Sequence, residues 1–372
     1  MLDHAQRLLD AVREVGPELE AMGRQAELER TLPAAAVQRL RELGLFWLKT
    51  PAELGGTELD PLEFCDVLEE VSYHDASAGW AVMVGNGTTG FLAGSLPDEG
   101  IAEIFAEDAP LPVIAGQFIP RGRAVRVDGG LRVTGRWSFC SGLPHADWLS
   151  GGCQTDDGEL CLVCVPKSEA TVIDTWHVAG LQGTGSHDFE LTDHFVPAGR
   201  AMRLAGEPAR RGGPLHRQPA RLFVGNELGP VAVGIARRAL DDMRTLAAGT
   251  SRGGAALRDR AAFQKAFGEA DARLAGARAL YRETVEMTWR AFLDDRVDEG
   301  LQSVSMARTT HAVDTCADLV ADIFRYGGGR VLALEHPMQR HLRNLLAAAQ
   351  HVFLTEENFE LAGRALLEGA DA

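Results

Sequence analysis

The stretch RAVRVDGGLRVTGRWSFCSG, residues 123–142, has a different pattern from the chain on either side of it. Apolar and polar residues alternate in two short runs, and Asp128-Gly129-Gly130 stands between them. Alternation places side chains on opposite faces of a strand, and an Asp-Gly step favours a tight turn, so we expect an antiparallel hairpin. Similar runs, separated by Gly, Asp and Pro, continue to about residue 203. The middle of the chain is therefore expected to form a β domain.

Both flanking regions have helical spacing. Apolar residues recur three and four apart up to about residue 106 and again from about residue 222 onward, where the segments are long and alanine-rich. The second region has room for four helices of about 20–30 residues each, the size of a helix bundle. Between sheet and bundle, residues 206–220 (GEPARRGGPLHRQPA) have the composition of a mobile linker.

These patterns predict a mostly α fold with a central antiparallel β domain. We expect three domains: an N-terminal helical domain over residues 1–109, a barrel-like middle β domain over 110–205, and a C-terminal four-helix bundle over 206–372.

Charge excludes one class of partner. The 372 residues include 37 Lys and Arg against 53 Asp and Glu, a formal net charge of −16. A phosphate backbone repels an acidic protein without a segregated basic patch, and we find no such patch, so no nucleic-acid partner is expected. The start of the chain is amphipathic rather than signal-like, and no run reaches the roughly 18 apolar residues of a membrane helix. We expect no membrane partner and a cytoplasmic location.

Six cysteines are scattered along the chain, which favours free thiols over disulfides. Cys161 and Cys164 match C-x-x-C, but they lie in the alternating run LCLVCVP, where residues three apart point to opposite faces. Packing is therefore the preferred interpretation, and no metal site is expected. The six are Cys65, Cys140, Cys153, Cys161, Cys164 and Cys316.

Familiar nucleotide and metal motifs are absent: the chain has no G-x-x-x-x-G-K-[ST], no H-E-x-x-H and no strand-linked G-x-G-x-x-G. The segment GLQGTGSHD, residues 180–188, places three glycines between two predicted strands. It is either a wide turn or a loop where backbone amides and the Thr184 and Ser186 hydroxyls approach a flat or phosphorylated ligand.

Two further segments combine aromatic and polar side chains. In GRWSFCSGLPHADW, residues 135–148, the residue types alone favour a core role for Trp137 and Trp148. In HPMQRHLRNLLAAAQHVF, residues 336–353, a continuous helix would place Arg340, Asn344 and His351 on one stripe. A single helical histidine is more often a surface or core residue than a catalytic one.

Taken together, these motifs resemble the acyl-CoA dehydrogenase superfamily over nearly the whole chain. The helical start contains L-x-x-L-G-L-F-x-L-x-x-P-x-x-x-G-G (Leu40 to Gly56), the middle domain G-x-W-x-x-x-S-G (Gly135 to Gly142), and one strand ends in Phe195-Val196-Pro197. Within the superfamily the chain is similar to two-component flavin-dependent monooxygenases of the p-hydroxyphenylacetate hydroxylase and dibenzothiophene monooxygenase type. The supporting residues are Ser77 to Trp80, Trp137 to Gly142, Trp176, Gly183 to Ser186, Pro337, Arg340, Arg343 and His351.

The resemblance implies an oxygenase component that receives reduced FMN or FAD from a separate flavin reductase and uses O2 as co-substrate. Through a C4a-(hydro)peroxyflavin it would hydroxylate or oxidise a small apolar, aromatic substrate. Homo-oligomers, tetramers or dimers, are implied as well. The choice between FMN and FAD, the substrate, and oxygen transfer to carbon, nitrogen or sulfur all stay open.

Site residues follow from the same resemblance. Ser141 would lie beside flavin N5 and stabilise the oxygenated flavin, and His351 would act on the substrate or the peroxide as a base or a proton donor. The expected flavin-binding residues are Trp137, Ser138, Phe139, Cys140, Ser141, Gly142, Trp176, Thr184, Ser186 and Arg252. The expected substrate-binding residues are Trp80, Asn86, Asn344 and His351.

Two alternatives remain. An acyl-CoA dehydrogenase or oxidase needs a carboxylate base, but His351 and Val352 stand where that family supplies a Glu, and AGQFIPRGRA replaces its acyl-CoA segment. Displaced bases would be Glu227, Glu356 or Glu357. A non-catalytic flavin- or ligand-binding homologue is the second alternative.

Overall fold

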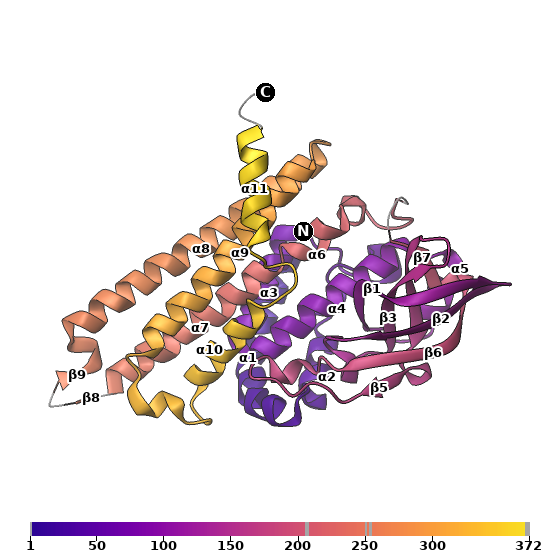
Figure 1. The fold of residues 1–372 in the computed structure, drawn as a ribbon. Helices are drawn as coiled ribbons and strands as arrows, with labels where there is room; N and C mark the ends of the chain where they lie inside the picture. Colours follow the sequence, from indigo (N-terminus) through magenta and orange to yellow (C-terminus); the bar gives the residue numbers. More distant parts are fainter. Residues whose placement is uncertain (1, 205–207, 250, 253–254, 369–372) are drawn as a thin grey trace.

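Figure 1 shows a helix bundle at one end of the molecule, a sheet at the other, and N-terminal helices between them. The computed structural model describes residues 2–204, 208–249, 251–252 and 255–368. The N-terminal helices are α1 (Leu2–Glu29), α2 (Ala34–Glu42), α3 (Pro61–His74), α4 (Ala76–Ser95) and α5 (Asp98–Ile104).

A seven-stranded sheet has the order β5-β6-β2-β1-β3-β4-β7. The expected hairpin is confirmed: β1 and β2 pair antiparallel, Val127 opposite Gly130, with Gly129 at φ 75°. The strands are β1 (Ile114–Val127), β2 (Gly130–Trp137), β3 (Trp148–Thr155), β4 (Leu160–Pro166), β5 (Thr171–Ile173), β6 (Asp188–Pro197) and β7 (Ala201–Arg203).

One pair departs from the expected antiparallel pattern, because β1 and β3 run parallel. β2 lies on one side of β1 and β3 on the other, so residues 138–147 must cross β1 to connect them. A crossing segment leaves the ladder, and its residues can face a neighbouring domain. The Ser138 to Gly142 motif lies in this crossover.

In its described residues the C-terminal region contains three long helices and three short ones, α6, α10 and α11, rather than four of 20–30 residues. α7, α8 and α9 have 22, 33 and 26 residues, whereas α10 and α11 have 12 each. Pro337 begins α10, as expected for a residue without an N–H, and a turn follows Ala348. The helices are α6 (Ala220–Gly225), α7 (Leu228–Gly249), α8 (Ala261–Leu293), α9 (Glu299–Phe324), α10 (Pro337–Ala348) and α11 (Glu357–Glu368), with β8 (Ser251–Arg252) and β9 (Ala255–Ala256) between α7 and α8.

The segment expected as a mobile linker is packed in its described part. The backbone N–H groups of Arg210 and Arg211 donate to the Gly94 carbonyl at 2.7 and 3.0 Å, and His216 is buried. Residues 205–207 lie outside the described residues. In its described part the segment is therefore packed on α4 through the backbone hydrogen bonds of Arg210 and Arg211, and its mobility stays a prediction.

Helix α4 lies at the centre of the molecule, between the sheet and the other helices (Figure 1). It is buried on nearly all sides, and glycines let its neighbours approach closely. A Cβ atom on Gly79 would lie 2.1 Å from Ser72 Oγ on α3. The N-terminal helices and the bundle share one hydrophobic core, while the sheet has its own. The boundaries at residues 109/110 and 205/206 stay our proposal.

All six cysteines are buried free thiols, as expected. Cys161 packs in the core of the sheet, whereas Cys164 packs on the opposite face of β4, against residues of α4 and α5. In the described ranges no helix is long and apolar enough to span a membrane. The same ranges contain no cluster of His, Cys, Asp or Glu that could hold a metal ion.

Candidate functional site

Two loops that the sequence analysis singled out lie side by side. The Gly142 N–H donates to the Thr184 carbonyl at 2.8 Å, and the Cys140 N–H donates to the His187 carbonyl at 3.1 Å. These bonds fix the β2–β3 crossover against the loop between β5 and β6, which includes a short 3-10 helix, η4 (Gln182–Thr184). Ser141 is thereby placed next to Ser186.

A chain of hydrogen bonds runs through these side chains. Trp80 Nε1 on α4 donates to Ser141 Oγ at 3.1 Å, and Ser141 Oγ lies 2.7 Å from Ser186 Oγ. Ser186 Oγ lies 2.7 Å from Thr184 Oγ1, which donates to the Leu181 carbonyl at 2.8 Å. Thr184 and Ser186 are buried, and Ser141 is half-buried. A helix, a crossover and a glycine-rich loop thus meet at three hydroxyl groups.

His351 joins this group from the turn after α10. The helix ends at Ala348, and the His351 N–H donates to the Ala348 carbonyl at 3.1 Å, so the expected helical stripe with Arg340 and Asn344 is wrong. The turn directs the imidazole toward α4 instead. Its ring centre lies 5.6 Å from that of Trp80, at an interplanar angle of 67°. Trp80 therefore contacts both candidate catalytic residues.

The environment of His351 determines its protonation. Burial lowers the pKa of His351 to about 4, so the ring is neutral at pH 7. The Phe353 N–H donates to His351 Nδ1 at 3.3 Å. A neutral imidazole whose Nδ1 accepts a hydrogen bond has its proton on Nε2. His351 is thus a hydrogen-bond donor through Nε2.

An aromatic surface lies at the outer end of the site. The side chain of Phe139 is 66% exposed, and its backbone adopts φ 62°, a region that residues with a Cβ rarely occupy. Its ring meets that of Trp176 edge to face at 5.9 Å, and Trp176 Nε1 donates to the Leu181 carbonyl at 3.0 Å. An exposed ring held in a strained conformation beside buried hydroxyls fits a flat, heteroaromatic ligand.

Two expected flavin contacts, Trp137 and Cys140, are not supported by the geometry. Trp137 is fully buried in the sheet core, where Nε1 donates to the Gly152 carbonyl at 2.7 Å and the ring stacks on Phe189 at 4.8 Å. Its core role is the correct interpretation. Cys140 is equally buried in that core. We leave these two residues out of the proposed site. Arg252 belongs to β8, and its side chain lies outside the described residues, so its contact with the flavin stays a prediction.

Other expected residues hold the site's backbone in place. Asn86 is fully buried, with Oδ1 accepting from the Lys49 N–H at 3.0 Å and Nδ2 donating to the Leu45 carbonyl at 2.7 Å. It has no surface for a substrate. Asn344 Oδ1 accepts from the Leu181 N–H at 2.7 Å, which ties α10 to the loop containing Thr184.

Asp188 is a positioning residue that sequence reasoning missed. This buried carboxylate accepts hydrogen bonds from Ser138 Oγ and Thr175 Oγ1, both at 3.0 Å, and pairs with Arg136. It thereby fixes the start of the crossover. Its place directly after the glycine-rich loop was the available signal, but its partners come from β2, the crossover and the loop after β5.

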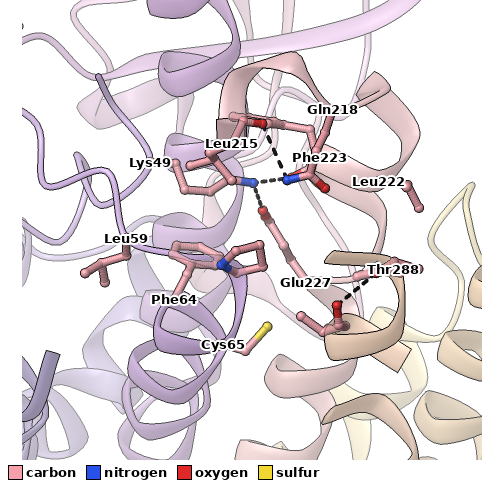
Figure 2. A pocket seen from close by; sticks show the side chains of 13 residues that line it. Lys49, Leu59, Phe64, Cys65, Leu215, Gln218, Leu222, Phe223, Glu227 and Thr288 are labelled. Carbon is pink, nitrogen blue, oxygen red and sulfur yellow. Dashed lines mark hydrogen bonds and ion pairs between the residues drawn. The ribbon is translucent and has the colours of Figure 1, made fainter. Parts of the chain in front are cut away.

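A second buried polar group lies between α3 and the start of the bundle. Figure 2 shows the Lys49 ammonium directed at the Glu227 carboxylate, and Lys49 Nζ donates to Glu227 Oε1 and to the Phe223 carbonyl. A cavity of about 20 Å³ adjoins the pair, with room for about one water molecule. Burial raises the pKa of Glu227 to about 7 and lowers the pKa of Lys49. Among the described residues, Glu227 Oε2 has no hydrogen-bond partner.

The candidate dehydrogenase bases are poorly placed. Glu227 is ion-paired with Lys49, and Glu356 and Glu357 are exposed at the start of α11. The turn after α10 presents His351 to Trp80 in place of a carboxylate. The geometry therefore gives no support to carboxylate-based dehydrogenation.

Both helical regions of the chain are similar to known protein families. Residues 3–95 match the N-terminal domain of acyl-CoA dehydrogenases, and residues 227–356 match their C-terminal domain. An indole-3-acetate monooxygenase from Pseudomonas putida is 32% identical over 365 residues, covering 96% of this chain and 92% of the relative. The oxygenase component of an FADH2-dependent resorcinol hydroxylase from Rhizobium sp. is 28% identical, covering 93% and 90%.

A solved structure has the same fold over nearly its whole length. XiaF from Streptomyces sp., in complex with FADH2 and glycerol, superposes with a TM-score of 0.90 at 26% identity, covering 99% of this chain and 96% of that one. The sequence identity and the fold together place the protein: the chain belongs to the acyl-CoA dehydrogenase superfamily, as a member of its flavin-dependent monooxygenases.

Proposed function

We propose that this monooxygenase is an oxygenase component that binds reduced FMN or FAD beside Ser141 and oxidises a small, apolar, aromatic substrate with O2. The observation that best supports this site is the junction of Ser141, Trp80 and His351, where a buried hydroxyl chain meets a neutral imidazole. Reduced flavin, when bound, supplies the two electrons that activate O2. A separate flavin reductase would deliver it.

Different residues of this chain would contact the cofactor and the substrate. Ser141 would contact the polar edge of the isoalloxazine, with the buried Ser186 and Thr184 holding it in position, and Phe139 and Trp176 would contact the flavin's face or its phosphate-bearing side. Trp80 Nε1 fixes the Ser141 hydroxyl, and its ring orients His351. Buried aromatic rings exclude water from this junction, which strengthens hydrogen bonds to a bound ligand.

We assign His351 the role of hydrogen-bond donor to the reacting oxygen or to the substrate. With Nδ1 accepting from the Phe353 N–H and the pKa lowered to about 4, the ring presents Nε2–H at neutral pH. Such a donor polarises an acceptor without leaving a buried positive charge behind. This choice resolves, as a proposal, the two roles that the sequence left open.

The test uses the purified protein, FMN or FAD, a flavin reductase and NADH. Indole-3-acetate and resorcinol, the compounds named for the two relatives, are the first candidate substrates. We expect O2 consumption coupled to an oxygenated product with at least one aromatic compound. Wild-type protein that neither binds reduced flavin nor changes the rate at which it reacts with O2 would contradict the proposal.

We also propose a homo-oligomer, a tetramer or a dimer. Large apolar side chains of the bundle are more than half exposed in the single chain, among them Leu332, Val352 and Leu366. Light scattering coupled to size exclusion should give a mass two or four times 40.1 kDa, and a monomer at micromolar concentration would contradict it. The cytoplasmic location stays a prediction.

A further inference from the structure

The three hydroxyl groups beside Trp80 have a fixed direction of hydrogen bonding. Three short contacts join them in series: Ser141 Oγ to Ser186 Oγ, Ser186 Oγ to Thr184 Oγ1, and Thr184 Oγ1 to the Leu181 carbonyl, at 2.7, 2.7 and 2.8 Å. Two oxygen atoms this close need a proton between them. Three contacts therefore require three protons, and three hydroxyl groups supply three.

The protons are assigned from the Leu181 carbonyl, where the series of hydrogen bonds ends. The Leu181 carbonyl has no proton, so the contact there uses the proton of Thr184. Thr184 must then accept from Ser186, and Ser186 must accept from Ser141. At the open end, Trp80 Nε1 can only donate, so Ser141 Oγ accepts from it. Ser141 has no proton left for a ligand and offers a lone pair alone.

Burial holds this arrangement in place. Thr184 and Ser186 are 1% and 2% exposed, so water cannot replace a lost partner. Reversing one hydroxyl would leave two oxygens facing each other without a proton, and a buried unsatisfied polar group costs about 1–3 kcal/mol. Ser141 is half-buried at the mouth of the chain, where its free lone pair is accessible to a ligand.

We infer that this one-way hydroxyl chain makes the site selective for the redox state of the flavin, with Ser186 and Thr184 as positioning residues that keep Ser141 a hydrogen-bond acceptor. The inference rests on the proposed function, with flavin N5 at Ser141. Reduced flavin has a hydrogen on N5 and can donate to Ser141, whereas oxidised flavin has only a lone pair there and needs a donor. The site thus binds reduced flavin, the form that a reductase delivers, more tightly than oxidised flavin, the form left after the reaction.

The experiment compares dissociation constants of oxidised and reduced FMN and FAD, the reduced forms under anaerobic conditions, by tryptophan fluorescence. Wild type should bind the reduced form more tightly. Ser186→Ala removes the acceptor of the Ser141 proton, so Ser141 becomes able to donate to oxidised flavin. One net hydrogen bond corresponds to about a two- to tenfold change, so the ratio of the oxidised to the reduced constant should fall by about that factor.

Thr184→Val and Thr184→Ser form a matched pair. Valine has nearly the shape of threonine but removes one proton and one acceptor, which frees Ser186 to donate to Ser141 and should lower the ratio as Ser186→Ala does. Serine keeps the hydroxyl group and the proton count, so Thr184→Ser should keep the wild-type ratio.

The outcomes separate the two claims. Ser186→Ala and Thr184→Val proteins that bind reduced flavin with the wild-type ratio would overturn the inference and leave the proposed function standing. Wild-type protein that binds neither redox form of either flavin would overturn the proposed function, and the inference with it.

Discussion

His351 illustrates how a single residue's role depends on its nearest backbone neighbours. The Phe353 N–H occupies Nδ1, and burial against the Trp80 and Phe353 rings keeps the imidazole uncharged. Sequence reasoning identified the residue but left base and proton donor open, because the tautomer depends on a turn that the helical pattern did not reveal.

The pH profile tests that assignment. Since the pKa of His351 is lowered to about 4, the coupling of flavin oxidation to product formation should be flat between about pH 6 and 8. A bend near pH 6.5 that disappears in His351→Gln would show a solvated histidine and contradict the account. Coupling is measured as product formed per flavin oxidised, with hydrogen peroxide release as the complement.

Two substitutions separate the donor role from packing. His351→Gln retains a terminal N–H group, and His351→Leu retains bulk without any polar atom. We expect His351→Leu to lower coupling about tenfold or more, because a transition-state hydrogen bond in a buried site is lost, with Gln intermediate. Equal coupling in Leu and wild type would exclude the donor role.

Between elements, the Lys49–Glu227 pair joins the segment after α2 to the residue preceding α7. Both side chains are buried, so removing one partner leaves a charge without compensation. We expect Glu227→Ala to lower the free energy of unfolding by about 3–5 kcal/mol. The double variant Lys49→Met/Glu227→Leu, which fills the same space with apolar atoms, should recover most of that loss.

Denaturant unfolding followed by circular dichroism measures both variants. A single variant as stable as wild type would mean that the pair is solvated, and a double variant no better than the single one would mean that the cavity beside it, rather than the charge, determines stability.

The types of element were predictable from the sequence, while several of their ends and one strand direction were not. Periodicity identified the helical regions before and after the sheet, the β1–β2 hairpin, and the opposite orientation of Cys161 and Cys164. It missed the parallel β1–β3 pair, because residues 138–147 cross β1 without any local signal. The helical stripe through His351 failed because α10 stops at Ala348.

The same limit applies to the site. Residue types in the crossover and the glycine-rich loop suggested both loops, and their hydroxyl groups do meet. The residue types alone favoured the core role that Trp137 has, but the resemblance assigned it to the flavin; a shift of one residue along a strand decides between the core face and the ligand face. Asp188 and the Lys49–Glu227 pair depend on contacts between distant segments, which a single sequence does not display.

Acid stability is a property of the whole molecule. Burial lowers the pKa of His145, His216 and His351 to about 4. The unfolded chain, with ordinary histidines near 6.5, binds more protons between about pH 6.5 and 4, so this stability is full above about 6.5 and is lost as the pH falls toward 4. Glu227, whose pKa is raised to about 7, stabilises the folded protein as the pH falls, but it is one group against three histidines.

Melting temperature against pH provides the check. We expect it to fall by at least about 5 °C between pH 6.5 and 4.5. His216→Leu, which removes a buried imidazole without hydrogen-bond partners in the described chain, should make the fall smaller. A melting temperature that stays constant or rises over this range would contradict the assignment of buried neutral histidines.

The whole account depends on where the flavin binds, and a crystal structure of the protein with reduced FMN or FAD, grown without oxygen, tests that most directly. We predict the isoalloxazine at the junction of the β2–β3 crossover, η4 and α4, with N5 about 3 Å from Ser141 Oγ and His351 on the substrate side. A flavin bound elsewhere, or one at this junction with Ser141 Oγ beyond hydrogen-bond reach of N5, would contradict it.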